Sequence, residues 1–139
     1  MKTDVTLKIE IPKIPDIELV AIEGLNRMAM HLGIADDKIG EARILVAEAI
    51  INGLEHGTGA DNPNVSVEFT MNAKELTIFV RDYGKGFQPS QVESPDIHSK
   101  LGGANKRGWG LKLMKSMSDD FQIESNSGGT KITIKKLLA

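Results

Sequence analysis

The sequence contains no cysteine, so disulfide bonds and thiolate metal sites are excluded. It has no apolar run approaching the roughly 20 residues that a membrane-spanning helix needs. The N-terminal segment MKTDVTLKIEIP alternates apolar and polar residues and lacks the apolar core of a signal peptide. From these absences we expect a soluble, cytoplasmic protein with no membrane partner.

An excess of charge of one sign is also missing. The formal net charge is -2, which gives no electrostatic reason to expect DNA, RNA or an anionic membrane as the main partner. Hydrophobic residues make up 40% of the chain and charged residues 26%, a balance typical of globular rather than disordered proteins. We expect residues 1–139 to form a single domain.

Hydrophobic periodicity predicts both helices and strands. The predicted strands cover residues 4–11, 64–71, 75–82, 120–125 and 130–137. The predicted helices cover residues 16–32, 36 or 37 to about 56, and 109–118. The order β-α-α-β-β-loop-α-β-β predicts an α+β fold: a two-layer α/β sandwich with helices over one face of a mixed, mostly antiparallel sheet.

Three residues are expected at special helix positions. Asp16 is a plausible N-cap and Gly33 a plausible C-terminal cap of the first helix. Asn52-Gly53 is a common hairpin-turn pair, but its Ala-, Leu- and Glu-rich flanks favour a helix. Inside that helix, Gly53 should cost about 1 kcal/mol relative to alanine.

The second predicted helix carries a carboxylate in an apolar run. The stretch ILVAEAIINGLEHG places Glu48 among aliphatic residues, where an unpaired charge costs several kcal/mol. Asn52 and His56 follow at intervals of four residues, so all three side chains share one helix face. A glutamate can act as a general base, and an asparagine oxygen can bind magnesium together with phosphates. The alternative is a partly exposed helix edge on which Glu48 pairs with a lysine.

A second candidate site follows the strand predicted at 75–82. The sequence DYGKGF begins with Asp82, whose carboxylate could accept a hydrogen bond from an exocyclic amine. Gly84 and Gly86 would let the backbone approach a flat ligand closely. An ordinary turn is the alternative, because Asp-x-Gly is common in turns.

A third candidate is the sequence KRGWGLKLM, in which Gly108 and Gly110 precede a predicted helix. The free amides at the start of that helix could hold phosphate, and Lys106 and Arg107 add positive charge. The sequence is neither a P-loop nor a dinucleotide-binding glycine motif, and it contains no protein-kinase H-R-D or D-F-G. Residues 83–108 show no periodicity, and loops of this length are usually functional or mobile.

A fourth element is the sequence GGT, in which Thr130 opens the last predicted strand. Its hydroxyl could face the same pocket, and a simple turn is the alternative. Together and in this order, the four motifs resemble those of the GHKL ATPase superfamily, which has the Bergerat fold. Its N box is matched by EAIINGLEH, and its two glycine boxes by DYGKG and RGWGL. Within the superfamily the chain resembles the bacterial anti-sigma-factor serine kinases.

The resemblance implies a role for each motif residue. Glu48 would be the general base, and Asn52 would bind the Mg²⁺ that bridges the phosphates of ATP. Asp82, backed by Thr130, would accept a hydrogen bond from the adenine amino group.

The resemblance also assigns the glycine boxes. Gly84 and Gly86 would shape the adenine pocket, and residues 88–107 would form a mobile lid. The phosphates would be met by Gly108, Gly110 and the amide of Leu111, with Lys106 or Arg107 reaching the γ-phosphate.

The reaction implied is transfer of the γ-phosphoryl group of ATP to a serine or threonine of a small antagonist protein. Members of the family also sequester a sigma factor, usually as homodimers. The sequence departs from the family pattern at Gly53 and Trp109. It also has Val20 and Ala21 where a partner-binding arginine is expected, so it resembles the family less in sigma-factor binding than in ATP binding.

Two other functions fit the same motifs. The protein could be a binding module that uses ATP or ADP only as a switch to hold a regulatory partner. Glu48 favours the kinase, because a switch needs no base. A histidine-kinase catalytic domain cut from a longer chain is the third possibility, and the start at Met1 and the short lid disfavour it.

Overall fold

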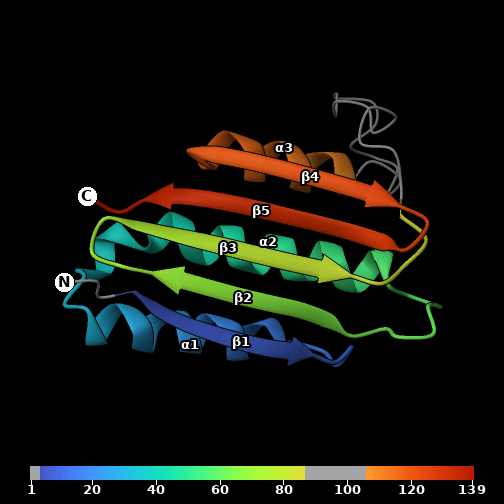
Figure 1. Ribbon diagram of the computed structural model, residues 1–139, viewed down its shortest axis with the longest axis horizontal. Helices are drawn as coiled ribbons and strands as arrows, with labels where there is room; N and C mark the ends of the chain where they lie inside the picture. Colours follow the sequence, from blue (N-terminus) through green and yellow to red (C-terminus); the bar gives the residue numbers. More distant parts are fainter. Residues whose placement is uncertain (1–3, 87–105) are drawn as a thin grey trace.

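The computed structural model describes residues 4–86 and 106–139, and only the backbone of residues 106–109. The strands in this part of the chain are β1 (Val5–Ile11), β2 (Val65–Met71), β3 (Glu75–Asp82), β4 (Asp120–Asn126) and β5 (Gly129–Leu137). The helices are α1 (Glu18–His31), the short 3-10 helix η1 (Asp36–Lys38), α2 (Gly40–His56) and α3 (Lys106–Met117). Figure 1 shows the sheet as one layer, with α1, α2 and α3 all behind it. The expected α+β two-layer sandwich is confirmed.

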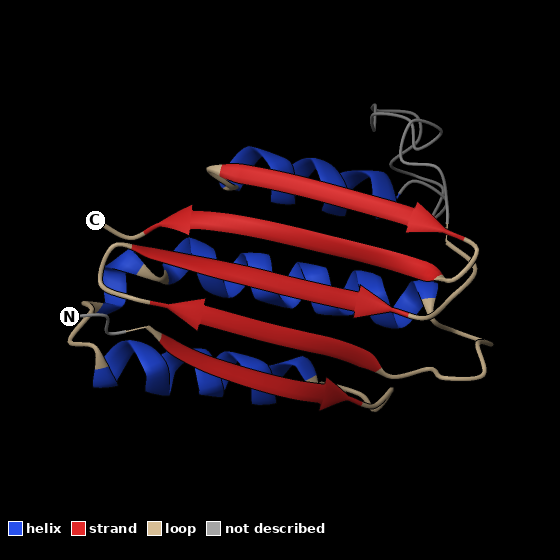
Figure 2. Ribbon diagram, viewed as in Figure 1, coloured by secondary structure: helices blue, strands red, loops and turns tan. Residues whose placement is uncertain are grey.

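The strands form one sheet in the order β1-β2-β3-β5-β4. All four pairings are antiparallel, so the sheet that we expected to be mostly antiparallel contains no parallel pair among the described strands. The last strand in the chain, β5, lies between β3 and β4 (Figure 2). This insertion places the start of β5 beside the end of β3.

The core lies between the sheet and the helices. Alternate strand residues point to the helices, and Phe69 of β2 and Ile78 of β3 are fully buried there. The helix α2 covers the centre of the sheet with one apolar face, formed by Ala42, Leu45, Val46, Ala49 and Ile50. Burying this face stabilises the domain by about 25 cal/mol for each Å² of apolar surface removed from water.

Two predicted helix starts are corrected by the structure. Asp16 is not the N-cap of α1: it has a left-handed backbone with φ 63°, which Asp tolerates, and Ile17 takes the cap position without a side-chain bond. The helix predicted from Asp36 or Asp37 is divided into η1 and α2. Gly33 is confirmed at the end of α1, with φ 71° directly after the cap residue Leu32.

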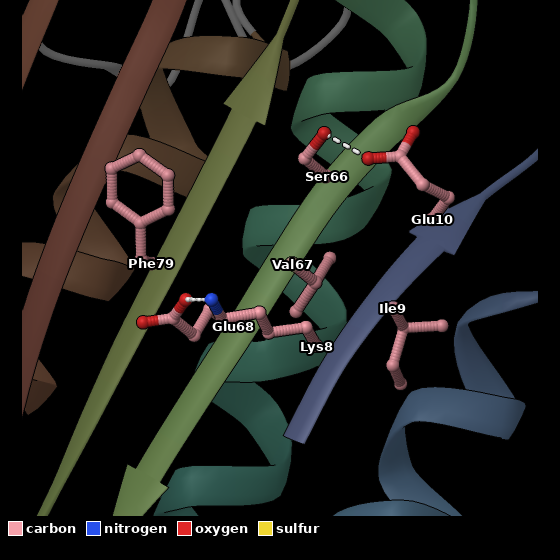
Figure 3. Close-up of a pocket in the computed structure, with 7 residues that line it drawn as sticks. All are labelled: Lys8, Ile9, Glu10, Ser66, Val67, Glu68 and Phe79. Carbon is pink, nitrogen blue, oxygen red and sulfur yellow. Dashed lines mark hydrogen bonds and ion pairs between the residues drawn. The ribbon is translucent and has the colours of Figure 1, made fainter. Parts of the chain in front are cut away.

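The face of the sheet away from the helices is polar. Figure 3 shows Lys8 and Glu68 paired across β1 and β2, and Glu10 beside Ser66, around a hollow of about 220 Å³. No helix in the described part of the chain is both long enough and apolar enough to cross a membrane.

Substituting Gly53 by alanine should change the free energy of unfolding by less than about 1 kcal/mol. Alanine would favour the helix by about 1 kcal/mol. However, its Cβ would lie 3.1 Å and 3.3 Å from the two methyl groups of Val65, a tight contact that offsets the gain. Urea unfolding of both proteins tests this expectation, and a stabilisation well above 1 kcal/mol would show that Val65 moves away freely.

Candidate functional site

The edge of α2 that borders its apolar face carries the polar residues that the sequence placed together. Glu48 is partly buried, Asn52 is 6% exposed, and the side chain of His56 is 3% exposed. The four-residue spacing on a regular helix brings these side chains into one row. Glu48 therefore lies at the border of the apolar face and is not enclosed by it.

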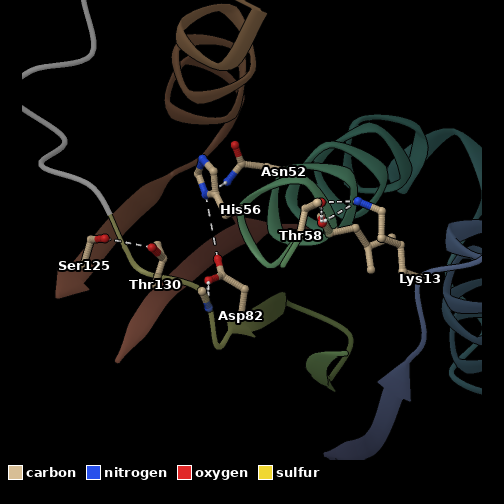
Figure 4. Close-up of polar contacts among 9 residues, drawn as sticks. Lys13, Asn52, His56, Thr58, Asp82, Ser125 and Thr130 are labelled. Carbon is tan, nitrogen blue, oxygen red and sulfur yellow. Dashed lines mark hydrogen bonds and ion pairs between the residues drawn. The ribbon is translucent and has the colours of Figure 1, made fainter. Parts of the chain in front are cut away.

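The end of β3 joins this row through Asp82, which is 2% exposed. Figure 4 shows His56 between Asn52 and Asp82. The His56 Nδ1 atom lies 3.4 Å from Asn52 Nδ2 and 3.7 Å from Asp82 Oδ2. The other oxygen of Asp82, Oδ1, accepts a hydrogen bond of 3.0 Å from the amide of Gly84. The helix and the strand thus meet in one buried polar cluster.

The last strand contributes Thr130 to the same cluster. Thr130 is directly opposite Asp82 in the β3–β5 pairing, so both side chains lie on the helix-facing side of the sheet. Thr130 is 1% exposed, and its hydroxyl is 2.8 Å from the Ser125 hydroxyl on β4. The structure therefore brings together two residues that lie far apart in the sequence.

The glycines after β3 are required by neighbouring backbone. A Cβ on Gly84 would lie 2.1 Å from the carbonyl oxygen of His56, and one on Gly86 would lie 2.0 Å from that of Asn126. Gly86 also has φ 77°, which side chains rarely adopt. The sequence interpretation assigned these glycines to contact with a ligand. The structure adds that they let the loop approach both α2 and the β4–β5 turn.

The helix α3 closes the other side of the row. A Cβ on Gly110 would lie 3.3 Å from Glu48 Oε2, so the helix backbone approaches this carboxylate closely. Leu111 is partly buried and packs against the core. Glu48 therefore lies at the α2–α3 contact.

The helix α3 begins at Lys106, three residues before the predicted start. Gly108 and Gly110 are therefore inside its first turns, and the prediction that they precede the helix is wrong. An α-helix leaves its first four N–H groups without a partner inside the helix. In α3 these are the amides of Lys106, Arg107, Gly108 and Trp109. Most of the predicted lid, residues 88–105, lies outside the described residues.

Sequence reasoning left two members of the cluster without a role. His56 was placed on the correct helix face, but the face alone did not reveal its contact with Asp82. Ser125 was predicted only as the end of a strand, and its contact with Thr130 depends on the strand register. A four-residue repeat of polar residues on α2 was the one signal available for His56.

The cluster has the features that an adenine nucleotide needs. Asp82 offers a carboxylate oxygen that can accept a hydrogen bond from an amine. The loop beside it has room only for glycine at positions 84 and 86. Asn52 offers an amide oxygen, and the N-terminus of α3 offers free N–H groups, which suit phosphate. Glu48 lies one helical turn before Asn52 and beside Gly110 of α3, and it can accept a proton.

Comparison with known proteins identifies the family to which the chain is similar. Residues 16–136 match the family described as histidine kinase-like ATPase domain. The chain is 31% identical over 136 residues to the serine-protein kinase RsbW of Bacillus velezensis, covering 94% of this chain and 85% of that protein. It is 30% identical over 104 residues to the anti-sigma F factor of Clostridium acetobutylicum, covering 74% and 73% of the two chains.

A solved structure supports the fold independently. The crystal structure of the RsbU and RsbW domains of a Mycobacterium tuberculosis protein superposes with a TM-score of 0.69 at 18% sequence identity. The match covers 96% of this chain and 32% of that longer one. From the family match and the identity to these relatives, the chain belongs to the histidine kinase-like ATPase family, the ATP-binding GHKL group that its motifs resemble.

Proposed function

We propose that this protein is an ATP-dependent serine/threonine kinase that phosphorylates a small anti-sigma-factor antagonist protein and sequesters a sigma factor. The observation that carries the proposal is the position of Glu48, a carboxylate one helical turn from Asn52 and next to α3. Relatives named as a serine-protein kinase and as an anti-sigma F factor support the same activity.

In this proposal the residues of the four sequence motifs have separate tasks. Asp82, with Thr130 opposite it, accepts a hydrogen bond from the adenine amino group and orients the base. Asn52 would hold Mg²⁺ through its amide oxygen, and the free amides at the start of α3, with Lys106, Arg107 and Gly108, would meet the phosphates. Because α3 begins at Lys106, the amides of Gly110 and Leu111 bond within the helix, and these two residues would lie beside the phosphates. Within the described residues, no group of three or more acidic or histidine side chains could hold a metal ion. Phosphate and water oxygens would complete the shell, as is common for Mg²⁺.

The chemical step requires little covalent work from the protein. ATP would give its γ-phosphoryl group to the hydroxyl oxygen and leave as ADP, and bound Mg²⁺ would neutralise the charge that develops during transfer. Glu48 takes the proton of the attacking serine or threonine hydroxyl, and α2 holds that carboxylate in a fixed position relative to Asn52. Gly110 leaves room beside the carboxylate, where a larger residue would contact it.

The proposed partners are an antagonist protein as substrate, a sigma factor, and a second copy of the chain in a cytoplasmic homodimer. The sequence has Val20 and Ala21 where an arginine was expected. Ala21 is fully buried and Val20 is 53% exposed, so only Val20 of this pair is available to a partner. A protein partner would therefore make an apolar contact with Val20 of α1, in place of a charged contact with an arginine.

Transfer of phosphate to a protein tests the function directly. The chain, MgATP labelled at the γ-position and a candidate antagonist are incubated together, and the antagonist is analysed for phosphoserine or phosphothreonine. Transfer that requires both Mg²⁺ and the chain is the expected result. Tight nucleotide binding with no transfer to any antagonist that binds the chain would favour the alternative, a non-catalytic ATP/ADP-dependent switch.

Asn52→Leu should remove the contribution of magnesium to ATP binding. Leucine has a similar size but no oxygen, so MgATP should bind at least about tenfold more weakly, as for the loss of one charge-assisted contact. Binding of ATP in EDTA should change little, and this comparison is the internal control. Calorimetric titrations with and without Mg²⁺ measure both values. Equal losses in the two conditions would contradict the assignment of Asn52 to the metal.

A further inference from the structure

His56 belongs to the cluster, and the proposed reaction assigns it no task. Its ring lies at the end of α2, with the side chain 3% exposed, and its Nδ1 atom faces two residues of the site at once. We infer that His56 is a positioning residue that makes the site selective for 6-aminopurine nucleotides. This inference rests on the proposed use of ATP.

The contact with Asn52 determines which way its amide points. Figure 4 shows the nitrogen of Asn52 toward His56 and its oxygen on the opposite side, toward α3. An imidazole nitrogen that carries no proton accepts a hydrogen bond from an amide NH₂ and repels an amide oxygen. The 3.4 Å contact between Nδ2 and Nδ1 therefore favours the orientation that leaves the Asn52 oxygen free for a ligand.

The contact with Asp82 restricts its carboxylate from the other side. Asp82 Oδ1 is held by the amide of Gly84 at 3.0 Å, and Oδ2 lies 3.7 Å from His56 Nδ1. That separation is too long for a hydrogen bond, so Oδ2 keeps its capacity to accept from another donor. The imidazole ring fills the space into which the carboxylate would otherwise rotate.

The main chain of His56 reinforces this arrangement. Its carbonyl oxygen occupies the place where a Cβ on Gly84 would be, at 2.1 Å from that ideal position. The backbone of His56 thus packs against the same loop whose amide holds Asp82. One residue at the end of α2 contacts both the strand end and the loop that follows it.

A carboxylate held in this way distinguishes two kinds of purine. An ionised carboxylate only accepts hydrogen bonds, so it pairs with the 6-amino group of adenine. Hypoxanthine carries an oxygen at the same position, and two acceptors facing each other are unfavourable. A buried polar group left unpaired by the wrong ligand is the usual basis of strong discrimination. The selectivity for adenine over hypoxanthine then depends on keeping the Asp82 carboxylate from rotating away from the base.

The test compares the dissociation constants of ATP and inosine triphosphate for the parent and for three variants. In His56→Ala the ring beside Asp82 is removed, so the carboxylate can turn away, and the preference for ATP should fall about tenfold. In His56→Phe a ring of similar shape remains, so most of the preference should be kept.

His31→Phe is the matched control, because His31 is exposed on α1 and should leave the preference unchanged. Equal weakening of ATP and inosine triphosphate binding in His56→Ala would show a merely structural role and overturn the inference. An unchanged preference in His56→Ala, a preference lost as fully in His56→Phe, or a parent that binds the two nucleotides equally would overturn it as well. If His56→Ala does not fold, His56→Asn, which also lacks the ring, takes its place. A parent that binds no nucleotide would instead contradict the proposed function.

Discussion

Replacing Glu48 by glutamine should reduce phosphoryl transfer to the antagonist by about 10²–10⁴-fold, the usual contribution of a general base. Glutamine has the size of glutamate and keeps the contact with Gly110, whose ideal Cβ position is 3.3 Å from Glu48 Oε2. It cannot take a proton from a hydroxyl at neutral pH. The loss should therefore appear in kcat, while the affinity for MgATP stays unchanged.

Glu55→Gln is the matched control, because Glu55 lies on the same helix outside the Glu48–Asn52–His56 row. The same labelled-ATP assay serves both variants, with calorimetry for nucleotide affinity. Transfer by the Glu48→Gln variant at the rate of the parent would show that another group takes the proton. A loss of MgATP affinity equal to the loss of rate would show that Glu48 acts in binding instead.

Replacing Gly84 by alanine should lower the free energy of unfolding by about 3 kcal/mol and greatly weaken ATP binding. The new Cβ would lie 2.1 Å from the carbonyl oxygen of His56 and 2.9 Å from its carbonyl carbon. Both are backbone atoms, so the loop must move as a whole. That movement would break the hydrogen bond from the Gly84 amide to Asp82.

Gly40→Ala separates this steric effect from the general effect of removing a glycine. Nothing lies within 4 Å of a Cβ placed on Gly40, and alanine is the better helix former at the start of α2. This control should be neutral or slightly stabilising. Urea unfolding gives the stabilities, and titration with ATP gives the affinities. If Gly84→Ala were as stable as the parent, the close packing of this loop against α2 would be wrong.

The sequence was sufficient for the order of the strands and α-helices, but not for the separate 3-10 helix η1. The alternation in β2 and β3 and the helical spacing in α2 are strong, because each element buries one face against the same core. The position of β5 between β3 and β4 was not accessible, since local periodicity says nothing about which strands pair. The opposition of Asp82 and Thr130 follows from that pairing alone.

Helix starts were the least accurate part of the sequence prediction. The two glycines near the start of α3 suggested a loop, yet the helix includes both. Asp16 suggested a cap, and its left-handed backbone places it outside the helix instead. In both cases a local preference worth about 1 kcal/mol does not determine where the helix begins.

The candidate site was predicted as four separate motifs, and the residues of each remain predictions as ligands. The structure supplies their common location: α2 provides Glu48 and Asn52, β3 provides Asp82, and β5 provides Thr130. The structure also places His56 in the site, a residue to which the sequence motifs assigned no role.

A crystal structure with a non-hydrolysable ATP analogue and Mg²⁺ would show directly where the nucleotide binds. We expect adenine with its amino group within hydrogen-bond distance of Asp82, and the metal bound to the amide oxygen of Asn52. Glu48 should face the γ-phosphate without binding the metal. A nucleotide on the opposite face of the sheet, in the hollow between Lys8 and Phe79, would contradict the account.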